Sequence, residues 1–156
     1  MAEFNEDPKP VTRHLVPEDQ EMGAAEDIFG DLFFLRLEPM IYKIAERRAQ
    51  DYQNHQFWRY FKLSNGGLYL KPEEDRLYAV SCANGIHADF SSDALGITAC
   101  LYAYSRCSSS FDEHFGSKCG DHYHLLRSYM MDHAEAAQMT SSCREFSRGT
   151  YWPCSM

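Results

Sequence analysis

The chain has 156 residues, of which 44% are hydrophobic and 24% are charged. This length is near that of one domain, and the composition is ordinary for a folded protein, so we expect a single core rather than a disordered chain. The 15 basic residues are outnumbered by 23 acidic residues, giving a formal charge of −8. That balance argues against a protein that binds nucleic acid through a basic surface.

The N-terminal residues and the hydropathy pattern indicate in which part of the cell the protein is located. No run of about 18 apolar residues is present, so we expect no transmembrane helix. Residues 1–10 are acidic and polar, and they lack the basic and apolar regions of a secretory signal. We therefore expect a cytoplasmic protein that does not associate with a membrane.

Most of the negative charge lies at the N-terminal end. Residues 1–31 contain nine acidic and two basic residues, whereas the other 125 residues carry a net charge of only −1. A protein that imitates DNA needs negative charge at phosphate-like spacing over an extended surface, and most of this chain is nearly neutral. Because three prolines oppose helix formation in this region, we expect residues 1–22 to form an acidic, flexible arm. A domain over 23–140 and a tail of unassigned structure over 141–156 would follow.

Hydrophobic spacing of three and four residues predicts two helices in the first third of the chain. A short helix is expected near 24–34 and a longer helix near 38–52. Pro39 interrupts the pattern between them. It suits the first turn of the second helix, because its missing N–H would have no partner there.

From Phe57 onward the hydrophobic period changes from 3.6 to 2, which predicts β-strands. Four strands are expected, over 57–63, 68–71, 77–82 and 86–90. Turns are expected at Asn65-Gly66-Gly67 and Asn84-Gly85, since these residues tolerate positive φ angles. The pattern predicts a four-stranded antiparallel β-meander that packs against several α-helices, in a single α+β domain. Its inner face would carry Leu68, Leu70, Ile86, Ala88 and Phe90.

The remaining elements are predicted to be helical. Residues 94–105 are apolar nearly all round, which is typical of a buried helix, and Ser91-Ser92-Asp93 supplies a polar start. One helical turn is expected at 111–115 and a helix at 121–131. The segment 134–139 either continues that helix or begins another.

Neither a metal site nor a catalytic site is expected. The six cysteines have irregular spacing and no CxxC pair, which in a cytoplasmic protein favours reduced thiols, with Cys82 and Cys100 in the core. Cys119, His122 and His124 are candidate zinc ligands, but residues two apart on a helix diverge by about 200°. The motifs of common hydrolases and nucleotide-binding enzymes are absent, so we expect no enzyme activity and no cofactor.

The aromatic residues of the strands leave a second function open. They share the other face of the predicted sheet and could stack the bases of single-stranded nucleic acid: Trp58, Tyr60, Tyr69 and Tyr78. Such binding also needs a basic groove, and few basic residues stand nearby: Arg59, Lys62, Lys71 and Arg76. Packing in the core is the commoner role of strand aromatics.

Three segments of the chain resemble the ArdB/KlcA antirestriction family. The first, 57–69, is a strand–turn–strand segment that contains Leu-Ser-Asn-Gly-Gly. The second, 93–105, resembles the central helix of the family. The third, 122–137, begins with His-Tyr-His-Leu-Leu-Arg and resembles a late helix. Ala134 stands where the family often has proline, which leaves open whether the last two helices merge.

The resemblance implies a small α+β protein of plasmids and other mobile elements that relieves type I restriction of incoming DNA. It further implies that the protein is neither an enzyme nor a polyanionic DNA mimic. The implied partner is the type I restriction enzyme complex or an associated host protein, with no stable direct binding of DNA. Exposed aromatic residues would support a homodimer. The candidate contact residues are Asn65, Gly66, Gly67, Asp121, His122 and Arg127. For the turn glycines, backbone geometry is the commoner role.

Overall fold

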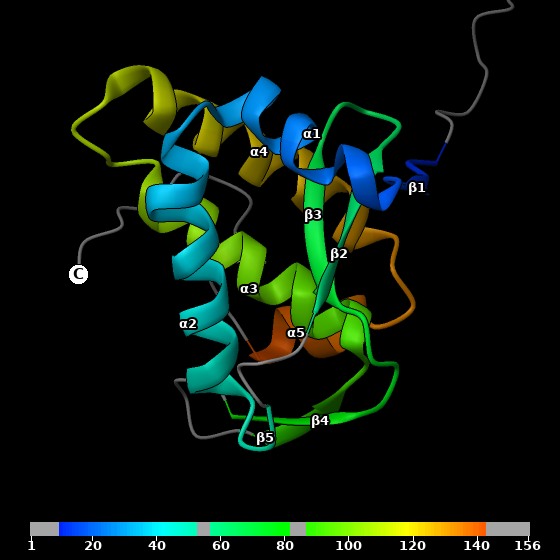
Figure 1. Ribbon diagram of the computed structural model, residues 1–156. Coiled ribbons are helices and arrows are strands. Elements are labelled where there is room, and N and C mark those ends of the chain that lie inside the picture. The colour runs from blue at the N-terminus through cyan, green and yellow to red at the C-terminus, as the bar shows by residue number, and fades with distance from the viewer. Residues whose placement is uncertain (1–9, 53–56, 82–86, 143–156) are drawn as a thin grey trace, which may run out of the picture.

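The computed structural model describes residues 10–52, 57–81 and 87–142 (Figure 1). The strands are β1 (Arg13–Leu15), β2 (Trp58–Leu63), β3 (Leu68–Pro72), β4 (Tyr78–Ser81) and β5 (His87–Phe90). The helices are η2 (Glu18–Gln20), α1 (Glu21–Phe29), η3 (Phe33–Leu37), α2 (Glu38–Arg48), α3 (Ser92–Cys107), α4 (Glu113–Met131) and α5 (Ala136–Ser142). The mixed α+β class that the sequence predicts is confirmed.

The predicted four-stranded meander is wrong. The strands form two separate sheets, one of order β1-β2-β3 and one that pairs β4 with β5, and every pairing is antiparallel. The hairpin of β2 and β3 forms as expected, with Tyr60 opposite Leu70. The third strand of this sheet comes from the N-terminal region, because Arg13 pairs with Leu63 and Leu15 with Phe61.

Helix α3 explains why the meander does not continue past β3. The helix lies along the outer edge of β3, where a further strand would otherwise pair (Figure 1). Its side chains satisfy backbone groups of that edge. The Leu70 N–H donates to the Cys100 Sγ at 3.4 Å, and the Tyr104 hydroxyl donates to the Leu68 carbonyl. A covered strand edge is unavailable to another strand, so β4 does not join this sheet. It pairs instead with β5 and, through a single bridge at Val80, with Ala49.

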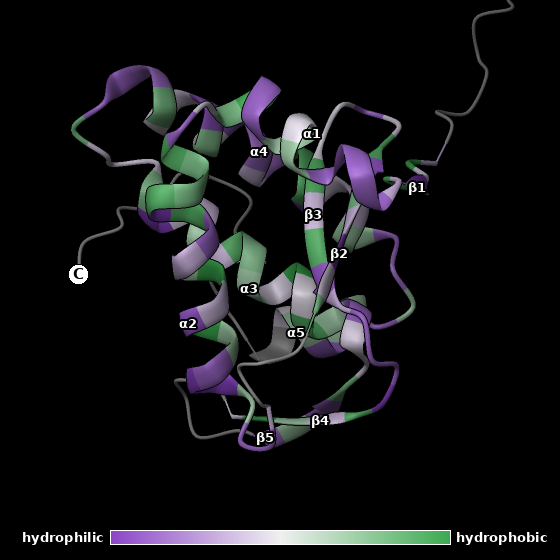
Figure 2. Ribbon diagram, in the orientation of Figure 1, coloured by the Kyte–Doolittle hydropathy of each residue, from purple (hydrophilic) through white to green (hydrophobic). Residues whose placement is uncertain are grey.

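The prediction that α3 is buried nearly all round is confirmed. Of its 16 residues, 14 are buried, including the polar side chains of Ser92, Thr98 and Ser105. Figure 2 shows the same contrast, with hydrophobic positions along α3 in the interior and hydrophilic positions on the outer turns of α2. Ser91 caps the helix, because its Oγ accepts from the Ala94 N–H at 3.1 Å.

The predicted inner face of the strands is confirmed for Leu68, Leu70 and Phe90, which are fully buried. Ala88 is half-buried against the core. Ile86, Cys82 and the Asn84-Gly85 turn lie outside the described residues. Cys100 lies in the core as expected, and burial raises the pKa of its thiol to about 12.

The N-terminal region differs from the predicted flexible arm. Residues 13–15 form β1, and residues 18–29 form η2 and α1. Residues 1–9 lie outside the described ranges. Several of the acidic side chains therefore occupy a helical surface, where they are exposed: Glu18, Asp19, Glu26 and Asp27. The acidic sequence does not oppose this order, because acidic groups are favourable near the positive end of a helix.

Pro39 lies in the first turn of α2, as the sequence predicts, but the break that ends the preceding helix falls earlier, at Gly30. Helix α1 ends at Gly30, which has a φ of 74°, and a π-helical segment, η3, then leads directly into α2. The Glu38 N–H donates to the Phe33 carbonyl, five residues back. Proline has no N–H and its ring opposes the usual bond to the carbonyl four residues back, which accounts for the wider turn immediately before it.

Helix α4 is longer than predicted. The turn expected at 111–115 and the helix expected at 121–131 are one continuous helix, capped by Asp112, whose Oδ1 accepts from the Phe115 N–H at 2.9 Å. Helix α5 is separate from α4, so the two do not merge at Ala134. Residues 143–156 of the expected tail lie outside the described ranges. Among the described helices, none has the length and hydropathy needed to cross a membrane.

Candidate functional site

The predicted turn at Asn65 lies against helix α4. The Asn65 Nδ2 donates to the Leu125 carbonyl at 3.0 Å, and its Oδ1 accepts from the Gly67 N–H at 3.0 Å. One amide side chain therefore closes the turn and holds it to the helix. The sequence grouped the turn with residues of α4 as one contact surface, and the structure brings the two elements together.

Backbone conformation accounts for Gly66, and close packing accounts for Gly67. Gly66 has a φ of 98°, a conformation that disfavours any residue with a Cβ, and its N–H donates to the Leu63 carbonyl at 2.9 Å. At Gly67 an added Cβ would lie 2.9 Å from Leu63 Cδ1 and 3.2 Å from Leu125 Cβ. Gly66 is exposed at the surface, whereas Gly67 is buried beneath the helix.

The three candidate residues on α4 do not share one face. Asp121 is exposed, Arg127 is half-buried, and His122 is buried at 6% exposure. Arg127 is two residues from Leu125, where the turn attaches. The ring of His122 instead lies against Phe29 and Tyr104 in the core, at centroid distances of 4.9 and 6.1 Å. His122 therefore cannot contact a partner directly and belongs to the support of the surface.

Burial makes His122 a neutral core residue. Desolvation lowers its pKa to about 4, and no described residue gives its Nδ1 a hydrogen-bond partner. The pKa is depressed in the folded state, so the stability linked to this group is fully present above a pH of about 6.5 and is lost as the pH falls toward 4.

We expect the free energy of unfolding to fall by about 2 kcal/mol between pH 7 and pH 5, through protonation of His122 in the unfolded chain. His122→Phe, which keeps an aromatic ring between Phe29 and Tyr104, should remove most of this dependence. Urea unfolding at a series of pH values measures it. His124→Gln, at an exposed position on the same helix, should leave the dependence unchanged. A pH dependence that persists in His122→Phe would contradict the assignment.

The structure also contains a polar centre that the sequence did not predict. Asp93, at the start of α3, accepts from Arg13 Nη1 and from the Tyr69 hydroxyl through Oδ1, both at 2.6 Å. Its Oδ2 lies 2.7 Å from the Nε2 of His133. The Arg13 Nη1 also donates to the Tyr69 hydroxyl at 2.9 Å. We call these residues, together with Glu135, the Asp93 network.

Glu135 joins the segment after α4 to the start of α3. Its Oε2 accepts from the Ser91 N–H at 3.0 Å, and its Oε1 accepts from the Ser91 hydroxyl. Its own N–H donates to the Nδ1 of His133 at 2.9 Å. The Asp93 network thus ties β1, β3, the start of α3 and the connection between α4 and α5 to one another.

The electrostatics of Asp93 favour its ionised form. Burial alone would raise its pKa, but hydrogen bonds from His133 and Tyr69 and the charge of Arg13 together lower the pKa below the usual value. The Asp93 side chain is 17% exposed and that of His133 is 12% exposed. Burial and the neighbouring Asp93 raise the pKa of Tyr69, which therefore stays protonated and donates.

The hydrogen bonds of His133 leave it no lone pair for general-base catalysis. The Nδ1 accepts the Glu135 N–H, so the proton of the ring is on Nε2, which donates to Asp93. A histidine that serves as a base needs one nitrogen open to the substrate. His133 therefore has a structural role, because both of its ring nitrogens are used in hydrogen bonds within the protein.

The candidate zinc ligands do not converge. Cys119 is fully buried and its thiol is hydrogen-bonded to that of Cys107 on α3. His122 lies in the core, and His124 is exposed. Among the described residues, no group of three or more potential ligands is arranged to hold a metal ion.

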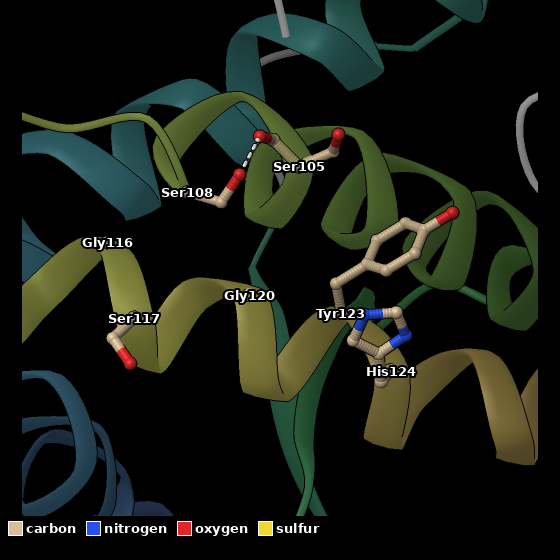
Figure 3. A pocket seen from close by; sticks show the side chains of 7 residues that line it. All are labelled: Ser105, Ser108, Gly116, Ser117, Gly120, Tyr123 and His124. Atoms are coloured by element: carbon tan, nitrogen blue, oxygen red, sulfur yellow. Dashed lines mark hydrogen bonds between the residues drawn. The ribbon is translucent and has the colours of Figure 1, made fainter. Parts of the chain in front are cut away.

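A pocket of about 250 Å³ lies between the end of α3 and α4 (Figure 3). Small residues line most of it, and Gly116 permits the close approach, since an added Cβ would lie 2.8 Å from the Ser108 carbonyl. His124 lies beside Tyr123 at one end of the pocket. Ser117 is seven residues away from His124, about 10 Å along the helix, so these two residues do not form a nucleophile–base pair.

The aromatic sheet face proposed for nucleic-acid binding is buried. Its four rings are between 0% and 6% exposed: Trp58, Tyr60, Tyr69 and Tyr78. Lys71 is also buried, and its Nζ donates to Asp75 and Ser92 at 3.0 and 3.1 Å. Stacking of bases needs open ring faces, so this arrangement does not support the alternative function.

The described residues form a small α+β fold, in which two antiparallel sheets pack around the buried helix α3. The family model described as antirestriction protein matches residues 50–142. The chain belongs to the antirestriction protein family. It is 35% identical over 139 residues to the antirestriction protein KlcA of Escherichia coli, a match that covers 86% of this chain and 95% of KlcA.

Two further comparisons agree with this assignment. The uncharacterized protein YafX of Escherichia coli strain K12 is 35% identical over 144 residues, with 87% of this chain and 90% of YafX covered. A solved structure described as that of the KlcA and ArdB proteins superimposes with a TM-score of 0.78 at 31% identity. That match covers 89% of this chain and 99% of the solved chain. The resemblance predicted from the three sequence segments is confirmed.

Proposed function

We propose that the protein relieves type I restriction of incoming DNA by contacting a protein of the host cell. Membership of the antirestriction family is the observation that carries this proposal. The similar KlcA and ArdB structure is described as having antirestriction activity against type I DNA restriction systems in vivo but not in vitro. An activity present only in vivo favours a partner that cells supply. The partner would be the restriction complex in the cytoplasm or a host protein associated with it.

The charge distribution supports contact with a protein rather than imitation of DNA. Residues 18–29, which form η2 and α1, carry exposed acidic side chains and no basic residue. Helix α1 has nine residues, so it is only about 14 Å long. Duplex DNA carries about one negative charge per 1.7 Å over the whole length that an enzyme contacts. Beyond residue 31 the chain is nearly neutral. A short acidic patch of this kind does not reproduce the surface of a duplex.

The proposed contact surface is the Asn65 turn together with the adjoining part of α4. Gly66, Asp121 and Arg127 are its outward positions, whereas Asn65, Gly67 and His122 shape it from beneath. The surface is rigid because the turn is hydrogen-bonded to the helix, and a preformed surface loses little conformational entropy when a partner binds. We infer that the protein acts through this surface without catalytic turnover.

Plating of unmodified phage on a host with an active type I restriction system tests the proposal. Expression of the protein should restore plating on that host and should leave plating on a type II restriction host unchanged. Failure to protect, with folded protein present in the cells, would overturn the proposed function. Asp121→Lys combined with Arg127→Glu should abolish protection if the contact surface is correct. Lys43→Glu, at an exposed position on α2, is the matched control and should protect fully.

A further inference from the structure

A second pocket, of about 270 Å³, lies between the starts of α1, α2 and β2. We call it the Glu38 pocket. Its lining is aromatic and acidic, from Tyr42, Trp58 and Tyr60 together with Glu38 and Glu21. None of the lining residues that the structure describes is a lysine, arginine or histidine. The volume is below the roughly 300–1,000 Å³ of typical small-molecule sites, and it suits a single side chain.

In the part of the chain that the structure describes, the carboxylate of Glu38 has neutral partners only. Its Oε2 accepts from the hydroxyls of Tyr42 and Tyr60, both at 2.9 Å. Burial, followed by the proximity of Glu38, raises the pKa of both phenols, so they remain protonated and donate. Within the described ranges, Glu38 forms no ion pair, although it is only partly exposed to solvent. A partly buried carboxylate without a cation nearby attracts one.

The other carboxylate of the pocket is already paired. The Nε of Arg59 donates to the Oε2 of Glu21 at 2.9 Å, and the same guanidinium donates to the Val16 carbonyl at 3.2 Å. Arg59 is therefore committed to Glu21 and to the backbone, outside the pocket lining. Among the described residues, the negative charge of Glu38 is left uncompensated, and the exposed Glu18 of η2, which interacts with Arg59, adds to the negative potential.

The aromatic walls suit an organic cation. The ring of Tyr42 lies 5.2 Å from that of Trp58, and Tyr52 lies 6.0 Å from Trp58 on the other side. The Trp58 Nε1 donates to the Tyr52 hydroxyl at 3.0 Å, which holds these two rings together. Trp58 and Tyr60 are buried, so the half-buried Tyr42 is the ring that a cation held at Glu38 would contact, through its π face as well as through charge.

The rim of the pocket is apolar and exposed. Phe57 is 78% exposed and Met22 is 68% exposed, on opposite elements that border the pocket. Exposed apolar side chains around a pocket that accepts one anchor residue are typical of protein contact sites. A free small cation would not need this rim, whereas the apolar neighbours of a basic residue in a polypeptide would pack against it.

We propose that the Glu38 pocket binds an arginine or lysine side chain of a protein partner. This proposal rests on the proposed function in one respect, that the partner is the protein through which restriction is relieved. The recognition itself follows from the uncompensated carboxylate, the aromatic walls and the apolar rim. Arginine suits the site best, because its planar guanidinium can stack on a ring while it donates to the carboxylate.

The probe for binding is N-acetyl-arginine methylamide, with the citrulline analogue as the neutral counterpart. We expect the indole N–H resonance of Trp58 to shift saturably with the arginine probe and not with the citrulline probe. Glu38→Gln keeps an acceptor for both tyrosines and should weaken binding about tenfold or more. Glu26→Gln, at an exposed position of α1 outside the pocket, should bind as the unaltered chain does.

Phe57→Ser removes the apolar rim at an exposed position, so the fold should be kept while the protein contact weakens. Glu38→Gln and Phe57→Ser should both reduce protection in the phage assay. If the arginine probe does not bind, or binds Glu38→Gln equally well, the pocket is not a cation site. If the probe binds but both variants protect fully, the pocket does not serve the partner. Failure of the unaltered protein to protect would instead overturn the proposed function alone, because binding of the probe is measured separately.

Discussion

Gly96→Ala is expected to destabilise the protein by more than about 3 kcal/mol, or to prevent folding altogether. Gly96 lies in α3 where the helix crosses the edge of β3. An ideal Cβ at this position would lie 2.3 Å from the Leu70 carbonyl oxygen and 2.6 Å from Lys71 Cα. Both neighbours are backbone atoms of a paired strand, so they cannot move as a flexible side chain could. The helix must shift, which breaks the bonds that Cys100 and Tyr104 make to β3.

Gly23→Ala is the matched control, because Gly23 lies in α1 and an added Cβ there meets no atom within 4 Å. Alanine in a helix is favoured over glycine, so this variant should be more stable by about 0.5–1 kcal/mol. Urea unfolding followed by far-UV circular dichroism measures both variants. If Gly96→Ala unfolds at the same urea concentration as the unaltered chain, α3 does not cover the edge of β3 as closely as the structure indicates.

Features of the fold that have a local sequence signal could be predicted, whereas the contact of α3 with β3 at Gly96 could not. The apolar pattern of 94–105 predicted a buried helix, and the Asn65 turn predicted the hairpin of β2 and β3, because both signals are local. Which strand or helix lies beside β3 depends on contacts far apart in the chain. A strand with one free edge reads the same in sequence whether a strand or a helix covers that edge, so the meander was a reasonable but wrong expectation.

The N-terminal region was mispredicted for a related reason. Acidic composition and prolines favour disorder in isolation. The structure nevertheless holds this region in place through tertiary contacts. Val16 donates its N–H to the Tyr60 carbonyl at 2.9 Å, and Arg13 reaches Asp93, 80 residues away. A strand of three residues has almost no hydrophobic period of its own, so no local pattern could have identified β1.

The candidate contact residues were predicted in part. The turn and α4 do meet, through Asn65 and the Leu125 carbonyl, and Asp121 is exposed as a contact residue must be. His122 was included because it begins the family-like His-Tyr-His-Leu-Leu-Arg segment. Successive residues of a helix are about 100° apart, and the packing of α4 against α1 and α3 determines which of them faces Phe29 and Tyr104.

The Asp93 network gives the three family-like segments a common physical role. Tyr69 belongs to the first segment, Asp93 to the second and His133 to the third, and the side chains of Tyr69 and His133 meet at the Asp93 carboxylate. The sequence showed Asp93 only as an acidic residue at a helix start. Nothing in the spacing of residues 69, 93 and 133 indicates that they are neighbours, because each lies on a different element.

Asp93→Asn is expected to lower the free energy of unfolding by about 2–3 kcal/mol at pH 7. Loss of one partner of a buried ion pair typically costs about 3–5 kcal/mol, and the smaller value applies here because the Arg13 side chain is 38% exposed. Asparagine cannot accept from Arg13, Tyr69 and His133 with a full charge, and its NH₂ group would face a donor. Thermal and urea unfolding measure the change, with Asp132→Asn, at an exposed position after α4, as the control.

The pH dependence of the free energy of unfolding distinguishes the contribution of Asp93 from that of His122. The pKa of Asp93 is lowered in the folded state, so its contribution is fully present above the unfolded pKa of about 4 and is lost as the pH falls below that value. The contribution of His122 is instead lost between about pH 6.5 and pH 4. Asp93→Asn should therefore flatten the curve only below about pH 4, and His122→Phe only above it. A loss in Asp93→Asn that is equal at pH 3 and pH 7 would show that the missing atoms matter by packing rather than by charge.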